Sequence, residues 1–165
     1  HLYLARRFFG IGGKGVSLRK ADAVQWLTDY SGKRFDMIID DLFGDEEGDG
    51  ARAVEVDADW LRGLTSHLKP NGVLVANFSS RVELGKAVDK GLRSARIKSA
   101  FQLTTAADEN AVGVFLPHYA DSVSLRKNLK ATPGLNPDAA SNRLNYRIRR
   151  LYPKAAQKRP ADPAR

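Results

Sequence analysis

Two short runs of almost continuous apolar residues constrain this chain most, because each is typical of a strand that is buried on both faces. The runs are Phe35–Ile39, which only Asp36 interrupts, and Val73–Phe78. Strands of this kind belong to parallel sheets that helices cover on both sides. Residues with helical spacing lie before each run, over Ala23–Tyr30 and Trp60–Leu68. Alternating strands and helices predict an α/β fold with a mostly parallel, Rossmann-like sheet.

Further elements are predicted on either side of this alternation. A capping box over Ser80–Glu83 opens another helix, and two strands close enough to form an antiparallel hairpin follow it. The remaining predictions are a helix over Leu2–Phe9, a short strand over Val16–Leu18, the hairpin strands Ile97–Leu103 and Ala111–Leu116, and a basic amphipathic helix from Asp138 to Leu151. A turn is predicted at Lys69–Gly72, where Pro70 and Gly72 would end the preceding helix.

Composition excludes several classes of protein. The chain has 165 residues, about the length of one domain, and it contains no Cys. Disulfide scaffolds, Cys-ligated zinc, iron–sulfur clusters and thiol catalysis are therefore excluded. No apolar run approaches the ~20 residues of a membrane span, and no signal peptide is visible, so we expect a cytoplasmic protein without a membrane partner.

Charge is distributed unevenly along the chain. Residues 143–165 hold eight of the 27 Lys and Arg residues against a single acid, Asp162. The segment Asp40–Asp59 has the opposite character, with nine acids and one base, Arg52. An acidic run is usually a solvated loop, although it also attracts cations and repels phosphates. The basic end leaves open a module that binds nucleic acid, whereas the nearly neutral body makes nucleic acid a partner we do not expect.

Two short motifs resemble ligand loops but have the wrong context. Gly10–Gly15 matches G-x-G-x-x-G, yet a predicted helix precedes it and a predicted strand follows, the reverse of a dinucleotide-binding loop. Asp45–Gly50 resembles the start of a calcium loop, but Val56 stands where the bidentate acid should be. We therefore interpret the glycines as a turn and expect no metal site.

Asp22 and Asp41 are the candidate functional carboxylates. Asp22 is placed to cap the helix that begins at Ala23, and its alternative role is to accept a hydrogen bond from a ligand amine. Asp41 directly follows a buried strand, where we expect partial burial among like charges and a role in handling the proton of an amine. An ordinary solvated turn would produce the same sequence at Asp41. In α/β sheets, ligands bind beyond the carboxyl ends of the strands, where both Asp41 and Asn77 are expected.

Together these segments resemble the spermidine synthase-like (polyamine aminopropyltransferase) branch of the class I S-adenosylmethionine-dependent methyltransferase fold. The resemblance covers roughly residues 2–117 and rests on a helix that ends in aromatic residues, a G-D-A-x-x-[FW]-[LI] segment, a [FY]-D-x-I-[IV]-x-D strand and an L-x-P-x-G-x-[LV] segment. The matching stretches here are Leu4–Phe9, Val16–Leu27, Phe35–Phe43 and Leu68–Asn77.

The resemblance implies roles for three residues. Asp22 takes the position of the Asp that contacts the adenine of the nucleoside ligand, and Ala23 is assigned to the same cofactor-binding segment. Asp41 takes the position of the Asp that binds the amine substrate and assists its deprotonation, so it is the expected catalytic residue and also part of the ligand site. The implied ligand is S-adenosylmethionine or decarboxylated S-adenosylmethionine, and the implied partner is a small-molecule amine; a homodimer is left open.

The chain also departs from the family pattern. The family's sheet order is 3-2-1-4-5-7-6, and nothing in this sequence matches the first two strands, which carry the Gly-rich loop and the ribose-binding acid. We therefore expect a fragment that binds S-adenosyl ligands poorly alone and is inactive in this form. Its expected parts are a partial transferase domain over 1–120, a helical extension over 121–152 and a disordered basic tail over 153–165.

Three functions remain open. The first is aminopropyl transfer from decarboxylated S-adenosylmethionine to an amine, with Asp22 and Asp41 at the ends of neighbouring strands and facing one nucleoside cleft. The second is a small-molecule methyltransferase that uses S-adenosylmethionine. The third is a non-catalytic module, which would bind nucleic acid through the predicted basic C-terminal helix.

Overall fold

The computed structural model describes residues 2–44, 52–92, 95–105, 109–132, 134–136, 138–139 and 146–153. The chain divides into two compact units, residues 1–32 and 33–165. The second unit contains a five-stranded sheet, and the first contains two short helices. None of the helices in the described part of the chain has the length and apolar character needed to cross a membrane.

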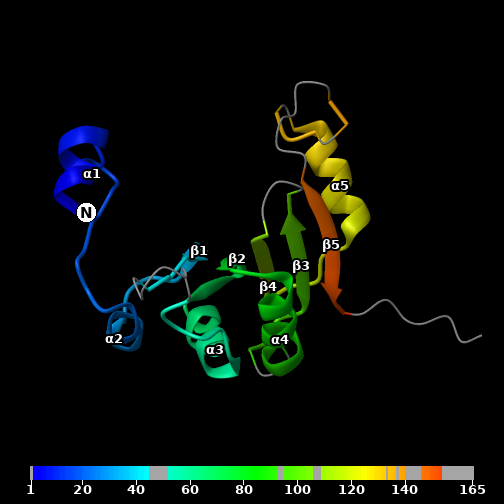
Figure 1. The fold of residues 1–165 in the computed structure, drawn as a ribbon, viewed down its shortest axis with the longest axis horizontal. Coiled ribbons are helices and arrows are strands. Elements are labelled where there is room, and N and C mark those ends of the chain that lie inside the picture. Colours follow the sequence, from blue (N-terminus) through cyan, green and yellow to red (C-terminus); the bar gives the residue numbers. More distant parts are fainter. Residues whose placement is uncertain are drawn as a thin grey trace, which may run out of the picture. The chain divides into compact units, whose positions relative to one another are not determined.

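The sheet of the second unit has the strand order β1-β2-β4-β3-β5 (Figure 1). Its strands are β1 (Phe35–Asp40), β2 (Leu68–Phe78), β3 (Ser99–Thr104), β4 (Ala111–Leu116) and β5 (Arg147–Tyr152). The first two strands pair in parallel, and the other three pairings are antiparallel. As a result, β1, β2 and β3 run in one direction, whereas β4 and β5 run in the other. The predicted α/β sheet and its antiparallel hairpin are both confirmed.

One face of the sheet is closed by two helices, α3 (Ala58–Ser66) and α4 (Arg81–Gly91), which contact each other and the strands β2 and β4 (Figure 1). We call this the closed face. Strand registry places Leu74 opposite Phe115 and Phe78 opposite Ala111, and all four side chains are fully buried. Beneath α4, Gly113 leaves room for its neighbours, since a Cβ there would lie 2.8 Å from the Phe115 ring.

The opposite face is covered only in part, and we call it the open face. The alternate residues of the same strands point toward it, so that Val75 lies opposite Val114 and Asn77 opposite Val112. On β1, Met37 is 54% exposed and Ile39 is 67% exposed. The helix α5 (Ser122–Ala131) contributes side chains to this face through Leu125 and Leu129. The two faces therefore differ in cover, although both are apolar.

The predicted turn at Lys69–Gly72 lies inside β2, which begins earlier than expected. Phe35 pairs with Leu68 and Met37 pairs with Val73, so four residues of β2 oppose a single residue of β1. Pro70 cannot donate a hydrogen bond to a neighbouring strand, which accounts for an interruption of the ladder at this point. The segment Lys69–Gly72 therefore forms an irregular part of β2 and is not a separate turn between α3 and the strand.

The predicted C-terminal basic helix is wrong over its last part. Residues 147–152 form β5, an edge strand that pairs with β3, with Ile148 opposite Leu103. Residues 140–145 lie outside the described residues, as do residues 154–165 of the expected tail. Within the expected helical extension over 121–152, the helix lies instead at α5, capped by Asp121, whose carboxylate accepts hydrogen bonds from Val123 and Ser124.

The first unit confirms two predictions and overturns one. The helix α1 (Leu2–Phe9) forms as expected, and α2 (Ala23–Asp29) begins after Asp22. The expected strand over Val16–Leu18 is absent, because Val16 makes only an isolated bridge to Gly13 and joins no strand of the sheet.

Candidate functional site

The carboxyl ends of the parallel strands β1 and β2 place two polar side chains together. Asp41 directly follows β1, and Asn77 is the penultimate residue of β2. The side-chain amide of Asn77 donates a hydrogen bond of 3.0 Å from Nδ2 to Oδ1 of Asp41. Asp41 is exposed, so the partial burial expected for it is wrong, and its carboxylate is open to solvent and to a ligand.

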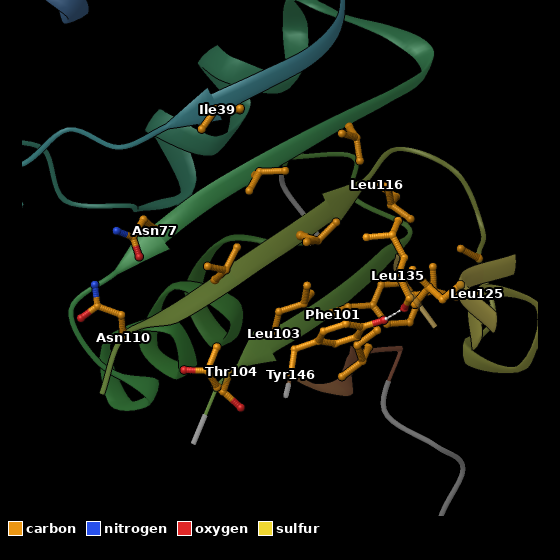
Figure 2. Close-up of a pocket in the computed structure, with 18 of the residues that line it drawn as sticks. Ile39, Asn77, Phe101, Leu103, Thr104, Asn110, Leu116, Leu125, Leu135 and Tyr146 are labelled. Carbon is orange, nitrogen blue, oxygen red and sulfur yellow. Dashed lines mark hydrogen bonds between the residues drawn. The ribbon is translucent and has the colours of Figure 1, made fainter. Parts of the chain in front are cut away.

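A groove of about 840 Å³ runs along the open face, and both members of this pair line it. Figure 2 shows Asn77 and Asn110 near each other among the residues that line the groove. Its floor is made by apolar side chains of β1, β2, β3 and β4, and α5 lines it through Leu125 and Leu129. Polar residues gather at the end near the carboxyl edge, namely Asp41, Asn77, Thr104, Thr105 and Asn110. An apolar cleft of this size with a few polar groups at one end is the usual form of a small-molecule site.

A buried ion pair lies at the same edge, and the sequence analysis missed it. Asp40 is 3% exposed and is the last residue of β1, directed to the closed face because its register partner is Ala76. Its Oδ2 atom accepts hydrogen bonds from Arg52 at 2.6 Å and from the indole of Trp60 at 2.9 Å. Two neighbouring carboxylates, Asp40 and Asp41, therefore have opposite environments.

Arg52 is the basic member of that pair and the lone base of the acidic segment. Its side chain is 3% exposed and lies between the rings of Phe43 and Phe78, 5.7 Å and 5.5 Å from their centroids. The guanidinium also donates to the backbone carbonyl oxygens of Val54 and Asn77. The signal in the sequence was the single base among nine acids, but a charge run on its own predicts a solvated loop.

The other two predicted site residues lie in the first unit. Asp22 caps α2, where its carboxylate accepts a hydrogen bond of 2.8 Å from the backbone N–H of Gln25, as expected for the capping role. Ala23 is the first residue of that helix. The cleft that Asp22 and Asp41 would share stays a prediction, because the two residues belong to different compact units.

The prediction that the chain has no metal site can be compared with the structure over the described residues only. Among the described residues, no group of three or more Asp, Glu or His side chains is placed to hold a metal ion. The calcium-like segment Asp45–Gly50 lies outside the described residues.

An S-adenosyl ligand carries a positive sulfonium and an adenine ring, and the groove offers an exposed carboxylate and an apolar floor that suit these two features.

Comparison with known proteins identifies the fold. No protein-family model and no curated protein matches this sequence. Among solved structures, human methyltransferase-like protein 13 in complex with SAH matches with a TM-score of 0.61 and 20% identity, over 76% of this chain and 62% of that one. A probable spermidine synthase from Corynebacterium glutamicum ATCC 13032 matches with a TM-score of 0.62 and 16% identity, over 90% of this chain and 54% of that one.

The chain thus spans a little over half the length of each of these two structures. At these identities the likeness establishes the fold and not the reaction. It agrees with the strand order found here, since β1-β2-β4-β3 corresponds to the order 4-5-7-6 that the resemblance implied. The described sheet therefore represents part of the class I S-adenosylmethionine-dependent methyltransferase fold, and the chain shares this part with a probable spermidine synthase.

Proposed function

We propose that this chain is the acceptor-binding part of a transferase that uses an S-adenosyl sulfonium donor and a small amine acceptor. One observation carries the proposal: the exposed Asp41 carboxylate, oriented by Asn77, stands at the polar end of an apolar groove and at the carboxyl ends of parallel strands. That is the edge where α/β sheets bind their ligands. The structural likeness to a SAH-bound methyltransferase-like protein and to a probable spermidine synthase supports the same class of donor.

The chemistry of an amine acceptor explains why a carboxylate is useful here. When bound, the donor supplies an electrophilic carbon next to its sulfonium. An amine can attack such a carbon only through an unprotonated nitrogen; as the new N–C bond forms, the C–S bond breaks and its electron pair leaves with the neutral thioether. A group that removes the proton from the amine therefore accelerates the reaction. Asp41 can accept that proton at its carboxylate, while the bond from Asn77 holds the carboxylate in one orientation. The negative charge also favours polyamine cations over neutral acceptors.

Aminopropyl transfer is the reaction we favour, because its acceptor is cationic and its donor lacks the carboxylate of S-adenosylmethionine, which the exposed Asp41 carboxylate would repel. The test is calorimetric titration of the longest natural form of the protein that contains these 165 residues. We expect decarboxylated S-adenosylmethionine and methylthioadenosine to bind more tightly than S-adenosylmethionine. The opposite preference would favour the methyltransferase, and binding of neither donor would refute the proposed function.

The role of Asp41 has its own test. Asp41→Asn keeps the shape of the side chain and removes the proton acceptor, so we expect kcat to fall by about 10²–10⁴. The matched control is Asp36→Asn, which changes an exposed carboxylate near the opposite end of β1 that pairs with Lys69. A fall in kcat of the same size in both variants would show that general loss of negative charge, and not Asp41, is responsible.

A further inference from the structure

The site described above depends on a hydrogen bond between two strand ends, and a third residue holds both of them. Arg52 donates from Nη2 to Asp40, the residue directly before Asp41. It also donates from Nη1 to the backbone carbonyl of Asn77, whose side chain is the partner of Asp41. On the closed face, a single guanidinium is therefore hydrogen-bonded to the ends of both β1 and β2. On the open face, the side chains of Asp41 and Asn77 connect the same two strand ends.

The guanidinium can hold these segments because its own position is fixed. It is almost fully buried between two aromatic rings, and its Nε donates to the Val54 carbonyl at 3.1 Å. Glu83 of α4 stands 4.0 Å from the same nitrogen. Close to Arg52, the chain pairs with residues just after β1, since the backbone N–H of Ala53 donates to Leu42 at 3.0 Å.

Arginine suits this task better than lysine would. Its planar fork presents several donors at fixed angles, so that one side chain can bond a carboxylate and two carbonyl oxygens at the same time. The Asp40 carboxylate is shared with the Trp60 indole, which ties the arrangement to α3 on the closed face. The network thus connects the rigid, closed side of the sheet to the exposed carboxylate on its open side.

We propose that Arg52 is a positioning residue, which sets the geometry of the Asp41–Asn77 pair by holding Asp40 and the Asn77 backbone together. Its importance for ligand binding rests on the proposed function, but its effect on the pair does not. Arg52 is the single base of the acidic segment Asp40–Asp59, so no other base of that segment can take its place.

The decisive experiment is NMR spectroscopy of the side-chain amide of Asn77 in the 165-residue chain, assigned with an Asn77→Asp variant. Asp41→Asn provides the reference spectrum of an altered Asn77–Asp41 bond. We expect Arg52→Met to shift the Asn77 amide signals in the same direction as the reference. The matched control is Arg62→Met, which removes an exposed arginine that pairs with Asp59 on the surface of α3 and should leave these signals unchanged.

Loss of stability must be separated from loss of positioning. Arg52→Met leaves the Asp40 carboxylate buried without its cation, which is costly, and the variant could unfold for that reason. The double variant Asp40→Leu/Arg52→Met removes both charges, so it should regain most of the stability that Arg52→Met loses. We still expect its Asn77 signals to be shifted. Wild-type Asn77 signals in either folded variant would overturn the proposal.

Ligand affinity is a second measurement, and it distinguishes the positioning role of Arg52 from the proposed transferase function. If decarboxylated S-adenosylmethionine binds the longest natural form of the protein, we expect the double variant of that form to bind it about tenfold more weakly or worse, and addition of Asp41→Asn to cost little more. Additive losses would overturn the positioning role. If neither donor binds the longest natural form of the protein, the proposed function fails, and the Asn77 signals alone still decide the role of Arg52.

Discussion

The two faces of the sheet differ in how they are covered, although both are built from apolar side chains. On the closed face, Phe78 and Phe115 are fully buried and their rings meet edge to face at 6.4 Å. On the open face, Ile39 is two-thirds exposed, and a groove follows the strands to the Asp41–Asn77 pair. The closed face thus holds most of the large fully buried side chains, whereas the open face combines the buried Phe101 with exposed apolar residues and a groove.

The same contrast separates two consecutive residues. Asp40 faces the helices and is neutralised by Arg52, whereas Asp41 is exposed and is contacted by the Asn77 amide. Side chains alternate between the faces of a strand, so one step along the chain moves a carboxylate from a buried, paired environment to an exposed one. The predictions that follow test this difference between the faces.

The largest effect is expected from truncating the closed face. Phe115→Ala removes a fully buried ring and should lower the free energy of unfolding by about 3–5 kcal/mol. Val114→Ala, one residue earlier on the open face, should cost clearly less because Val114 is only partly buried. Denaturant titration of both variants measures the difference. Equal losses would show that the open face is packed as tightly as the closed one.

A smaller effect concerns pH and the helix α5, which lies beside the open face. Hydrogen bonds from the backbone N–H and the hydroxyl of Ser124, and from the backbone of Val123, lower the pKa of Asp121 below its ordinary value of 3.8. The carboxylate form is therefore favoured by folding. The stabilisation is complete above that ordinary value and is lost as the pH falls through the lowered pKa.

Amide hydrogen exchange measured at Val123 and Ser124 should accordingly show opening of α5 at acidic pH, after correction for the pH dependence of intrinsic exchange. The amide of Glu83 is the internal control, because the hydroxyl of Ser80, which does not titrate, caps α4 on the closed face. Asp121→Asn should abolish the pH dependence at α5. Equal opening of both helices would instead indicate global acid unfolding.

The smallest effect is expected at the exposed end of the open face. Ile39→Thr keeps a β-branched side chain on the strand and should change the free energy of unfolding by no more than about 0.5 kcal/mol. Its control is Ile38→Thr, on the closed face of the same strand, which should cost more. Measurement at two protein concentrations sharpens the test, since a large, concentration-dependent loss at Ile39 would mean that a second copy covers it.

Much of the fold could be predicted because its central strands carry an unambiguous pattern. Phe35–Ile39 and Val73–Phe78 are almost continuous apolar runs, and both lie in strands of the sheet. The C-terminal part was mispredicted because Ile148 and Leu151 satisfy a helical spacing within a short segment. Pairing of residues 147–152 with β3 decided in favour of a strand. Local spacing cannot reveal such a distant partner.

The candidate site was predicted in part. Asp41 and Asn77 were expected at the strand ends, and the structure brings them into hydrogen-bonding contact. Arg52 was noticed only as a charge, because twelve residues separate it from Asp40 and no local pattern distinguishes a buried cation from a solvated one. Asp22 was correctly predicted to cap a helix, and its role toward a ligand stays a prediction.

Local patterns in the sequence specify which segments become the central strands and helices and where the polar strand ends follow them, since hydrophobic periodicity and capping residues act over a few positions. Long-range packing determines which face of the sheet each carboxylate occupies and which cation it contacts. Strand registry and helix cover fix those relations between residues that lie far apart in the chain. Burial then makes the Asp40–Arg52 pair structural and leaves Asp41 accessible.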